Sequence, residues 1–232
     1  KSAVHLVLKE IKVYKKKLFD ILKIGLPAGV QGSLFSLSNV VIQSSVNSFG
    51  PIVVAGNAAA ANLEGYVYVS MNAFHQSTIT FVSQNVGGQK YKRVNKIIYT
   101  GLACVIVVGL VLGVGVFLGG NILLRCYTNS SAAVASGITR LQYVCCIYFL
   151  CGIMDVLVGA LRGLGSSWTP MIVSLLGVCA FRLLWIFTVF EIDRFHVIET
   201  VYISYAISWI FTSAVHAACL FVIRRIKKRH WG

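Results

Sequence analysis

Three charged side chains, Asp155, Glu64 and Arg182, lie inside long apolar stretches of this 232-residue chain. If those stretches cross a membrane, each charge costs about 2.5–3.5 kcal/mol on insertion scales and needs water or a partner. A carboxylate held there can bind and release a proton, or bind a cation such as Na⁺. Asp155 is the best candidate for such a site. The alternative for Asp155 is a structural ion pair with Arg182.

The other charged or titratable residues of these stretches have simpler roles. Glu64 is a weaker candidate, because it falls near one end of a long predicted helix, where water can solvate it. Arg182 is better explained as the structural partner of a carboxylate than as a substrate ligand. His75 and His216 are single histidines on predicted helices, and hydrogen bonding inside a bundle is their simplest role.

Polar residues recur at steps of three and four along three apolar stretches, which places each set on one helix face. These sets are Ser36, Asn39, Gln43 and Asn47; Glu64, Tyr68, Asn72, His75 and Gln76; and Ser204, Ser208, Thr212 and His216. Such faces line a bundle interior or a wet cavity. Interhelical hydrogen bonding without a cavity is the alternative, but three stripes with charges favour a cavity. Met71, Phe74 and Tyr68 offer contacts for flat cations, although such residues more often serve packing.

Six apolar stretches carry these residues, and each is long enough to cross a membrane, which takes about 20 mostly apolar residues. They cover residues 20–48, 52–86, 95–118, 134–160, 170–190 and 199–223. Apolar residues make up 57% of the chain and charged residues 12%, roughly half the charge of a soluble domain. We therefore predict an all-α, polytopic bundle of six transmembrane helices over residues 20–224. Gly109, Gly113 and Gly115 in the third stretch indicate close helix packing.

The basic residues predict the orientation of the bundle. Lys and Arg are concentrated in alternate connections, whereas the opposite connections hold Arg125 and Arg194. Basic connections lie on the cytoplasmic side, so both ends of this segment are predicted to be cytoplasmic. The location predicted is the cell inner (plasma) membrane. The net charge of +14 then faces anionic lipid rather than nucleic acid.

The two ends of the chain have their own patterns. Residues 1–19 alternate lysines with apolar residues at helical spacing, which predicts an amphipathic linker helix on the cytoplasmic surface. Residues 225–232 form a basic cytoplasmic tail. Because the first residue is Lys1 rather than methionine, the chain is expected to begin inside a longer one.

Several function classes receive no support from the sequence. No HExxH, GxSxG or CxxC motif is present, so we predict that the protein is not an enzyme and has no cofactor or metal beyond a possible Na⁺ at Asp155. Six of the seven cysteines lie in apolar stretches and are predicted to be small buried residues. A passive channel needs no titratable group in mid-membrane, and a purely structural subunit needs no polar stripes.

Four motifs carry a family resemblance across nearly the whole chain. They are Ile24-Gly25-Leu26-Pro27, the run from Ser83 to Gln89 (SQNVGGQ), the run from Asp155 to Gly165 (DVLVGALRGLG), and Thr169-Pro170-Met171. Their order and spacing resemble the C-terminal lobe of the multidrug and toxic compound extrusion (MATE) family. In physical terms, the paired glycines at 87–88 and Gly163 end helices, Ser167 or Thr169 can cap the next helix, and Pro27 can bend the first span.

The resemblance implies a fold and a function. Family members have two six-helix lobes and export organic cations and other drugs in exchange for Na⁺ or H⁺. In some members the aspartate matching Asp155 is implicated in cation binding. Some of those members also carry a glutamate about two turns after the first-span proline, where this chain reads Leu34-Phe35-Ser36. An Na⁺ site built from both carboxylates is therefore not supported.

The predicted function is efflux of organic cations or drugs by Na⁺ or H⁺ antiport through alternating access, with a missing N-terminal lobe as partner. A lipid-linked oligosaccharide flippase is the alternative within transport, although its cavity should hold more cationic groups than Arg182. A structural or regulatory membrane subunit is the alternative from another class.

Overall fold

The computed structural model describes residues 12–230, with side chains through Lys227, and this part of the chain is helical without strands. The long helices are α1 (Lys15–Asn47), α2 (Pro51–Gly87), α3 (Tyr91–Leu118) and α9 (Ile198–His230). The shorter ones are α4 (Gly120–Arg125), α5 (Ser131–Tyr143), α6 (Phe149–Gly163), α7 (Trp168–Ser174) and α8 (Phe181–Thr188). The 3₁₀ turns η2 (Cys145–Ile147) and η4 (Asp193–Phe195) and the π-helical turn η3 (Leu175–Ala180) join some of them.

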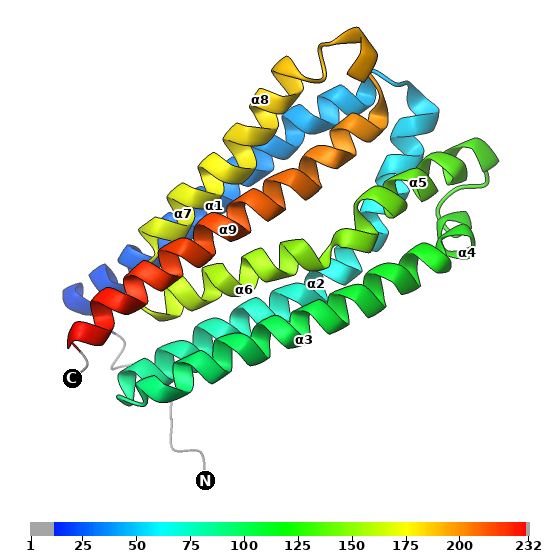
Figure 1. The fold of residues 1–232 in the computed structure, drawn as a ribbon. Coiled ribbons are helices and arrows are strands. Elements are labelled where there is room, and N and C mark those ends of the chain that lie inside the picture. The colour runs from blue at the N-terminus through cyan, green and yellow to red at the C-terminus, as the bar shows by residue number, and fades with distance from the viewer. Residues whose placement is uncertain (1–11, 231–232) are drawn as a thin grey trace.

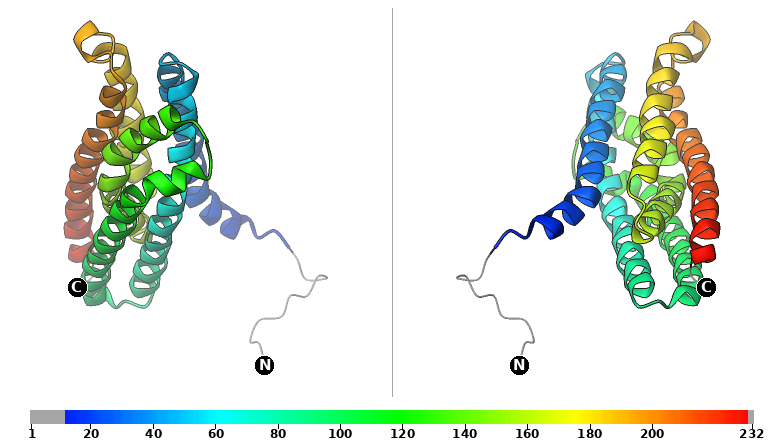
Figure 2. Two further views of the ribbon diagram at one scale, coloured as in Figure 1. Left: turned by 90° about the vertical axis from the view of Figure 1, so that its right-hand side faces the viewer. Right: turned by 90° about the vertical axis from the view of Figure 1, so that its left-hand side faces the viewer.

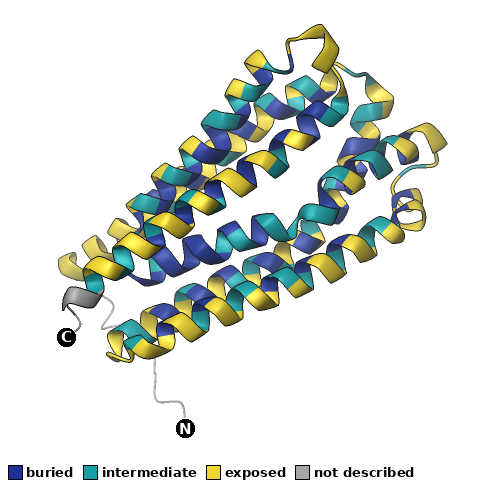
Figure 3. Cartoon of the chain, in the orientation of Figure 1, coloured by how far each residue is buried: buried dark blue, intermediate teal, exposed yellow. Residues whose placement is uncertain are grey.

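The helices form two packed groups. In one, α2 packs against α3, α5 and α6, and in the other α1 packs against α7, α8 and α9. The two groups meet where α6 packs along α9, near the middle of the view in Figure 1. The outer face of α3 is exposed along most of its length (Figure 3). This face is apolar, as expected of a helix in contact with lipid.

The basic connections gather at one end of the bundle. Figure 1 shows the start of α1, the turn between α2 and α3, the end of α6 and the end of α9 together at that end. This is the alternation that the sequence predicted. The assignment of this end to the cytoplasm stays a prediction.

Four of the six predicted stretches form helices that are long and apolar enough to cross a membrane, one of them only as a bent pair. By length and composition, α3, the continuous α7–α8 segment and α9 are each able to cross a membrane. The segments Ser131–Ile147 and Phe149–Gly163 are long and apolar enough to cross a membrane only when taken together, and they are bent by 42° at the break between them. α1 and α2 are also long enough to cross a membrane, but they are less apolar than the other spans. Both helices carry the predicted polar stripes.

The break between α5 and α6 corrects the predicted single span over residues 134–160. No proline or glycine lies at the break, so the sequence held no local signal for it. The structure brings the Cys145 backbone against α3: a Cβ added to Gly113 would lie 2.3 Å from the Cys145 carbonyl oxygen. Gly109 packs in the same way against Phe149. These two contacts confirm the close packing predicted for the third stretch, whereas Gly115 has open space beside it.

The turns form where glycine and proline predicted them. Gly50 precedes α2 with φ of 90°, and Pro51 takes the first helical position, where its missing N–H costs nothing. α2 ends at Gly87. Ser167 precedes α7, but its side chain makes no capping hydrogen bond. Pro27 lies inside α1, and Figure 2 shows the first turns of α1 at an angle to the rest.

The predicted boundaries at the two ends differ from the helices. Residues 1–11 of the predicted linker helix lie outside the described residues, and Lys15–Phe19 form the start of α1 itself. At the other end α9 runs on to His230, so the predicted tail begins inside this helix. The cysteine prediction is wrong for Cys104, which is exposed, although Cys145, Cys151 and Cys179 are buried.

Gly56 holds α2 against α5, and its replacement should destabilise the bundle. A Cβ at this position would lie 2.3 Å from the Ala133 carbonyl oxygen and 2.8 Å from the Gly137 amide nitrogen, both of them backbone atoms. We expect Gly56→Ala to lower the free energy of unfolding by about 1–3 kcal/mol, measured by thermal unfolding in detergent. Gly65→Ala on the same helix is the control, because nothing lies within 4 Å of its added Cβ. Equal unfolding temperatures for the two variants would contradict this contact.

Candidate functional site

The strongest polar contact inside the bundle joins Glu64 of α2 to Arg140 of α5. Arg140 donates from Nε and Nη2 to the two Glu64 carboxylate oxygens, each at 2.8 Å. Glu64 is 4% exposed and Arg140 8% exposed. This two-point geometry is the one that guanidinium and carboxylate groups favour. The pair is therefore a buried, fully formed salt bridge.

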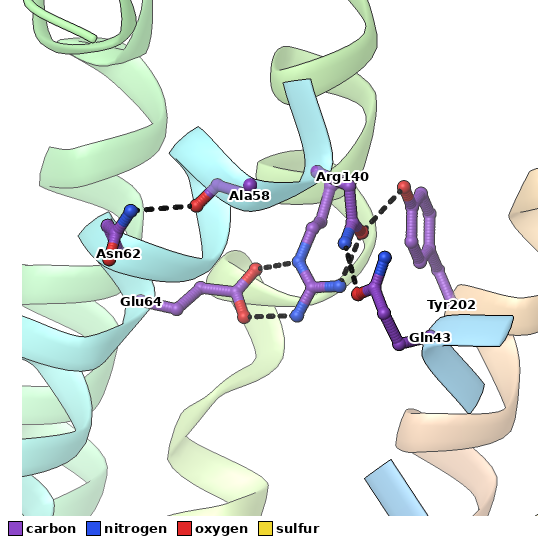
Figure 4. A network of polar contacts seen from close by, with 7 residues as sticks. Gln43, Ala58, Asn62, Glu64, Arg140 and Tyr202 are labelled. Atoms are coloured by element: carbon purple, nitrogen blue, oxygen red, sulfur yellow. Dashed lines mark hydrogen bonds and ion pairs between the residues drawn. The ribbon is translucent and has the colours of Figure 1, made fainter. Parts of the chain in front are cut away.

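A chain of hydrogen bonds extends the ion pair to two further helices (Figure 4). Arg140 Nη1 donates to Asn57 Oδ1 at 2.6 Å, and the Tyr202 hydroxyl of α9 donates to the same oxygen at 3.2 Å. Asn57 Nδ2 donates to Gln43 Oε1 of α1 at 3.1 Å. The Arg140 guanidinium also lies 5.6 Å from the Tyr202 ring centroid. The network therefore links α1, α2, α5 and α9.

The buried pair corrects two interpretations of the sequence. Glu64 is not solvated, and its carboxylate is occupied by Arg140, so it is not a free cavity group in this structure. Arg140 is the charged partner that the sequence analysis missed. The available signal was its position inside the fourth apolar stretch, where a charge needs a partner. Gln43 belongs to the network rather than to an open face.

Asp155 lies on α6 in a different environment. It is partly exposed, and among the described side chains it makes no ion pair or hydrogen bond through its carboxylate. Its backbone carbonyl accepts a 2.6 Å hydrogen bond from the His75 ring, which fixes α6 against α2. Arg162 lies two turns further along α6, and its Nη2 donates to Gln31 Oε1 of α1 at 2.8 Å. Asp155 is thus a half-buried residue on a packed helix, and its carboxylate is unpaired among the described side chains.

Arg182 is not the partner of Asp155, which corrects the predicted ion-pair alternative. Its guanidinium lies 4.0 Å from the Tyr205 ring centroid and 5.5 Å from that of Trp209. Its Nε donates to the Ser208 hydroxyl at 2.9 Å. Arg182 lies on α8 next to the π-helical turn η3, and its contacts are to α9. Packing against the rings of α9 therefore replaces the carboxylate that the sequence led us to expect.

The stripe of the sixth stretch faces the interior of the bundle. Ser204, Ser208, Thr212 and His216 are all fully buried on α9. His216 Nε2 lies 3.1 Å from the Ser174 hydroxyl of α7. Interhelical hydrogen bonding, the role given as the alternative to a cavity, therefore describes His216.

The stripe of the first stretch is more exposed. Ser36, Asn39 and Asn47 are exposed on α1. The Ser36 hydroxyl donates to the Gly32 carbonyl at 3.1 Å, which is a local bond within the helix. These side chains leave one face of α1 polar and uncovered by the rest of this chain.

The stripe of the second stretch divides between surface and core. Tyr68 is 43% exposed and Asn72 partly exposed, whereas Met71 and His75 are buried. Met71 packs between Gly109 of α3 and Gly152 of α6. Met71 is thus a packing residue here, and His75 positions α6. Tyr68 and Asn72 keep part of their surface exposed.

The all-helical fold, with several apolar helices of membrane length, places the chain among the polytopic membrane proteins. The family model MatE matches residues 27–188, which is more than half of the chain. The chain therefore belongs to the MATE family.

Relatives named in other organisms agree with this assignment. The chain is 31% identical over 162 residues to "Probable multidrug resistance protein YpnP" of Bacillus subtilis strain 168, covering 70% of this chain and 36% of that protein. It is 23% identical over 158 residues to "Probable multidrug resistance protein NorM" of Aromatoleum aromaticum, covering 68% and 34%. The chain thus spans about a third of the length of these relatives.

Solved structures show the same fold. The crystal structure of the Vibrio cholerae MATE transporter VcmN in the bent form superposes with a TM-score of 0.83 at 17% identity. The match covers 97% of this chain and 51% of that one. A MATE structure in complex with MaL6 gives a TM-score of 0.84 at 15% identity, covering 97% and 51%. The fold of this chain corresponds to about half of a MATE transporter.

Proposed function

We propose that this chain is one lobe of a secondary active efflux transporter that exports organic cations or drugs in exchange for Na⁺ or H⁺. The observation that carries the proposal is Asp155, a half-buried residue whose carboxylate has no ion-pair partner among the described residues. A paired carboxylate such as Glu64 is already neutralised, whereas an unpaired one is available to a proton, a metal cation or a cationic substrate.

The helix that carries Asp155 suits alternating access. α6 is tied to α2 through His75 and to α1 through Arg162 and Gln31. A proton or cation bound at Asp155 would change the charge of α6 beside its contact with α2 and two turns from its contact with α1. If the proton or cation binds more tightly in one of the inward-facing and outward-facing states than in the other, its gradient drives the change between them and so drives transport.

The substrate would bind between this lobe and a second, N-terminal lobe. The exposed polar residues Ser36 and Asn39 of α1, with Tyr68 and Asn72 of α2, would line this lobe's side of the cavity. Tyr68 offers an aromatic face for a cationic ligand near Asp155. A partner lobe is proposed because the structural relatives are about twice as long as this chain.

The experiment is efflux of a fluorescent organic cation from cells that express the native gene, compared with empty vector. The Na⁺ and proton gradients are collapsed in turn. We expect faster efflux with the gene, lost with one of the two gradients, which identifies the coupling ion. Efflux no faster than with empty vector would favour a structural or regulatory subunit. Efflux insensitive to both gradients would contradict antiport.

A further inference from the structure

A pocket at the basic end of the bundle, away from Asp155, has the composition of an anion site. It has a volume of about 990 Å³ and lies between the start of α3 and the end of α9. Five of its lining residues are cationic, namely Lys90, Lys92, Arg93, Arg224 and Arg225, and no aspartate or glutamate lines it. A compact set of cations without acidic neighbours attracts phosphate groups.

The helices that form the pocket keep it open. α3 and α9 each pack against α6 rather than closely against one another. At the mouth, Arg224 of α9 donates a hydrogen bond to Asn95 of α3, which bridges the two helices. The first backbone amides of α3 lie at the same end and add the positive end of a helix dipole. The pocket is therefore held by three helices and carries positive charge from two of them.

The part of the pocket further from the end of the bundle is lined by two exposed aromatic residues. Tyr99 is 67% exposed and Phe221 is 66% exposed, and both line the pocket. Tyr99 lies six residues beyond Arg93, or about 9 Å along α3 at 1.5 Å per residue. Phe221 lies about one turn before Arg224 on α9. The cations thus lie at the end of the bundle, with aromatic rings one to two turns towards its centre.

We propose that this pocket binds the phosphate headgroup of an anionic phospholipid, with an acyl chain lying along Tyr99 and Phe221. A soluble phosphate would use the cations alone, whereas a lipid uses both parts of the pocket. The cations lie at the end of the bundle and the aromatic rings nearer its centre, which matches a bilayer, where the phosphates lie outside the hydrocarbon. Basic pockets between helices on the cytoplasmic side are sites where anionic headgroups bind. The site is independent of Asp155 and of the transported substrate.

The test is native mass spectrometry and lipid titration of the purified protein expressed from its native gene. Phosphatidylglycerol, phosphatidylcholine and inorganic phosphate are the three probes. We expect the wild type to retain phosphatidylglycerol selectively. In the double variant Arg224→Gln/Arg225→Gln its affinity should fall roughly thirty-fold. The matched control is Arg125→Gln/Arg194→Gln, which removes two exposed basic side chains outside the pocket and should leave binding unchanged.

A second variant tests the lipid tail. Phe221→Ala should weaken phosphatidylglycerol binding and leave any binding of inorganic phosphate unaltered. Thermal unfolding without lipid checks that the variants remain folded. If the pocket variant and the control variant lose phosphatidylglycerol affinity equally, the proposed site is wrong. Binding of inorganic phosphate with no preference for phosphatidylglycerol over phosphatidylcholine would overturn the lipid assignment.

Discussion

Replacing Arg140 with methionine is expected to lower the free energy of unfolding by about 3–5 kcal/mol. The substitution leaves the Glu64 carboxylate buried without a counter-charge, at 4% exposure. The cost of such an orphaned charge exceeds the worth of the pair itself, because water is no longer present to solvate it. It also removes one of the donors to Asn57, which joins α2 to α9 through Tyr202.

The double variant Glu64→Leu/Arg140→Met separates these contributions. With both charges removed, the desolvation cost disappears, so most of the lost stability should return. Thermal unfolding of the purified protein in detergent measures each step. Arg125→Met removes an exposed arginine and is the matched control. If Arg140→Met is as stable as the Arg125→Met control, Glu64 and Arg140 are not paired in the native protein.

Replacing Asp155 with asparagine is expected to reduce efflux to the level of empty vector. The amide keeps the size of the side chain but cannot bind a proton or carry the negative charge that attracts a cation. Because no described side chain pairs with the Asp155 carboxylate, little stability should be lost. Transport should therefore fail while the folded protein still reaches the membrane.

The efflux assay with a fluorescent organic cation measures this effect, alongside the amount of protein in the membrane fraction. Asp193→Asn, which removes an exposed carboxylate from the connection between α8 and α9, is the control and should transport normally. If Asp155→Asn exports as fast as wild type with the same dependence on ion gradients, Asp155 is not the coupling group. The coupling carboxylate would then be sought in the partner lobe.

The spans and the turns between them were predictable because their signals are local. A run of apolar residues must be helical in hydrocarbon, where every backbone hydrogen bond is made within the helix. Gly50 precedes α2 with φ of 90°, and α2 ends at Gly87 as predicted, although the left-handed residue of that turn is Gln89, with φ of 56°. The alternating basic connections likewise predicted which helix ends lie together.

The pairing of charges was not predictable from the same signals. Glu64 and Arg140 are 76 positions apart, and their contact depends on how α2 and α5 are rotated about their axes. The same holds for Arg182, whose partner proved to be the Tyr205 ring rather than the Asp155 carboxylate. Sequence spacing places residues on a face of their own helix, but it does not say which neighbour that face meets.

By itself, the sequence determined that the chain is an all-helical membrane bundle with one basic end, because composition and periodicity act within single helices. The tertiary structure decided which charges are neutralised and which remain accessible. It buried Glu64 against Arg140, placed Arg182 over the Tyr205 and Trp209 rings and left Asp155 unpaired among the described residues. It also broke the span between α5 and α6, where the Cys145 carbonyl packs against Gly113. These outcomes depend on contacts between helices, which close packing selects and local sequence does not encode.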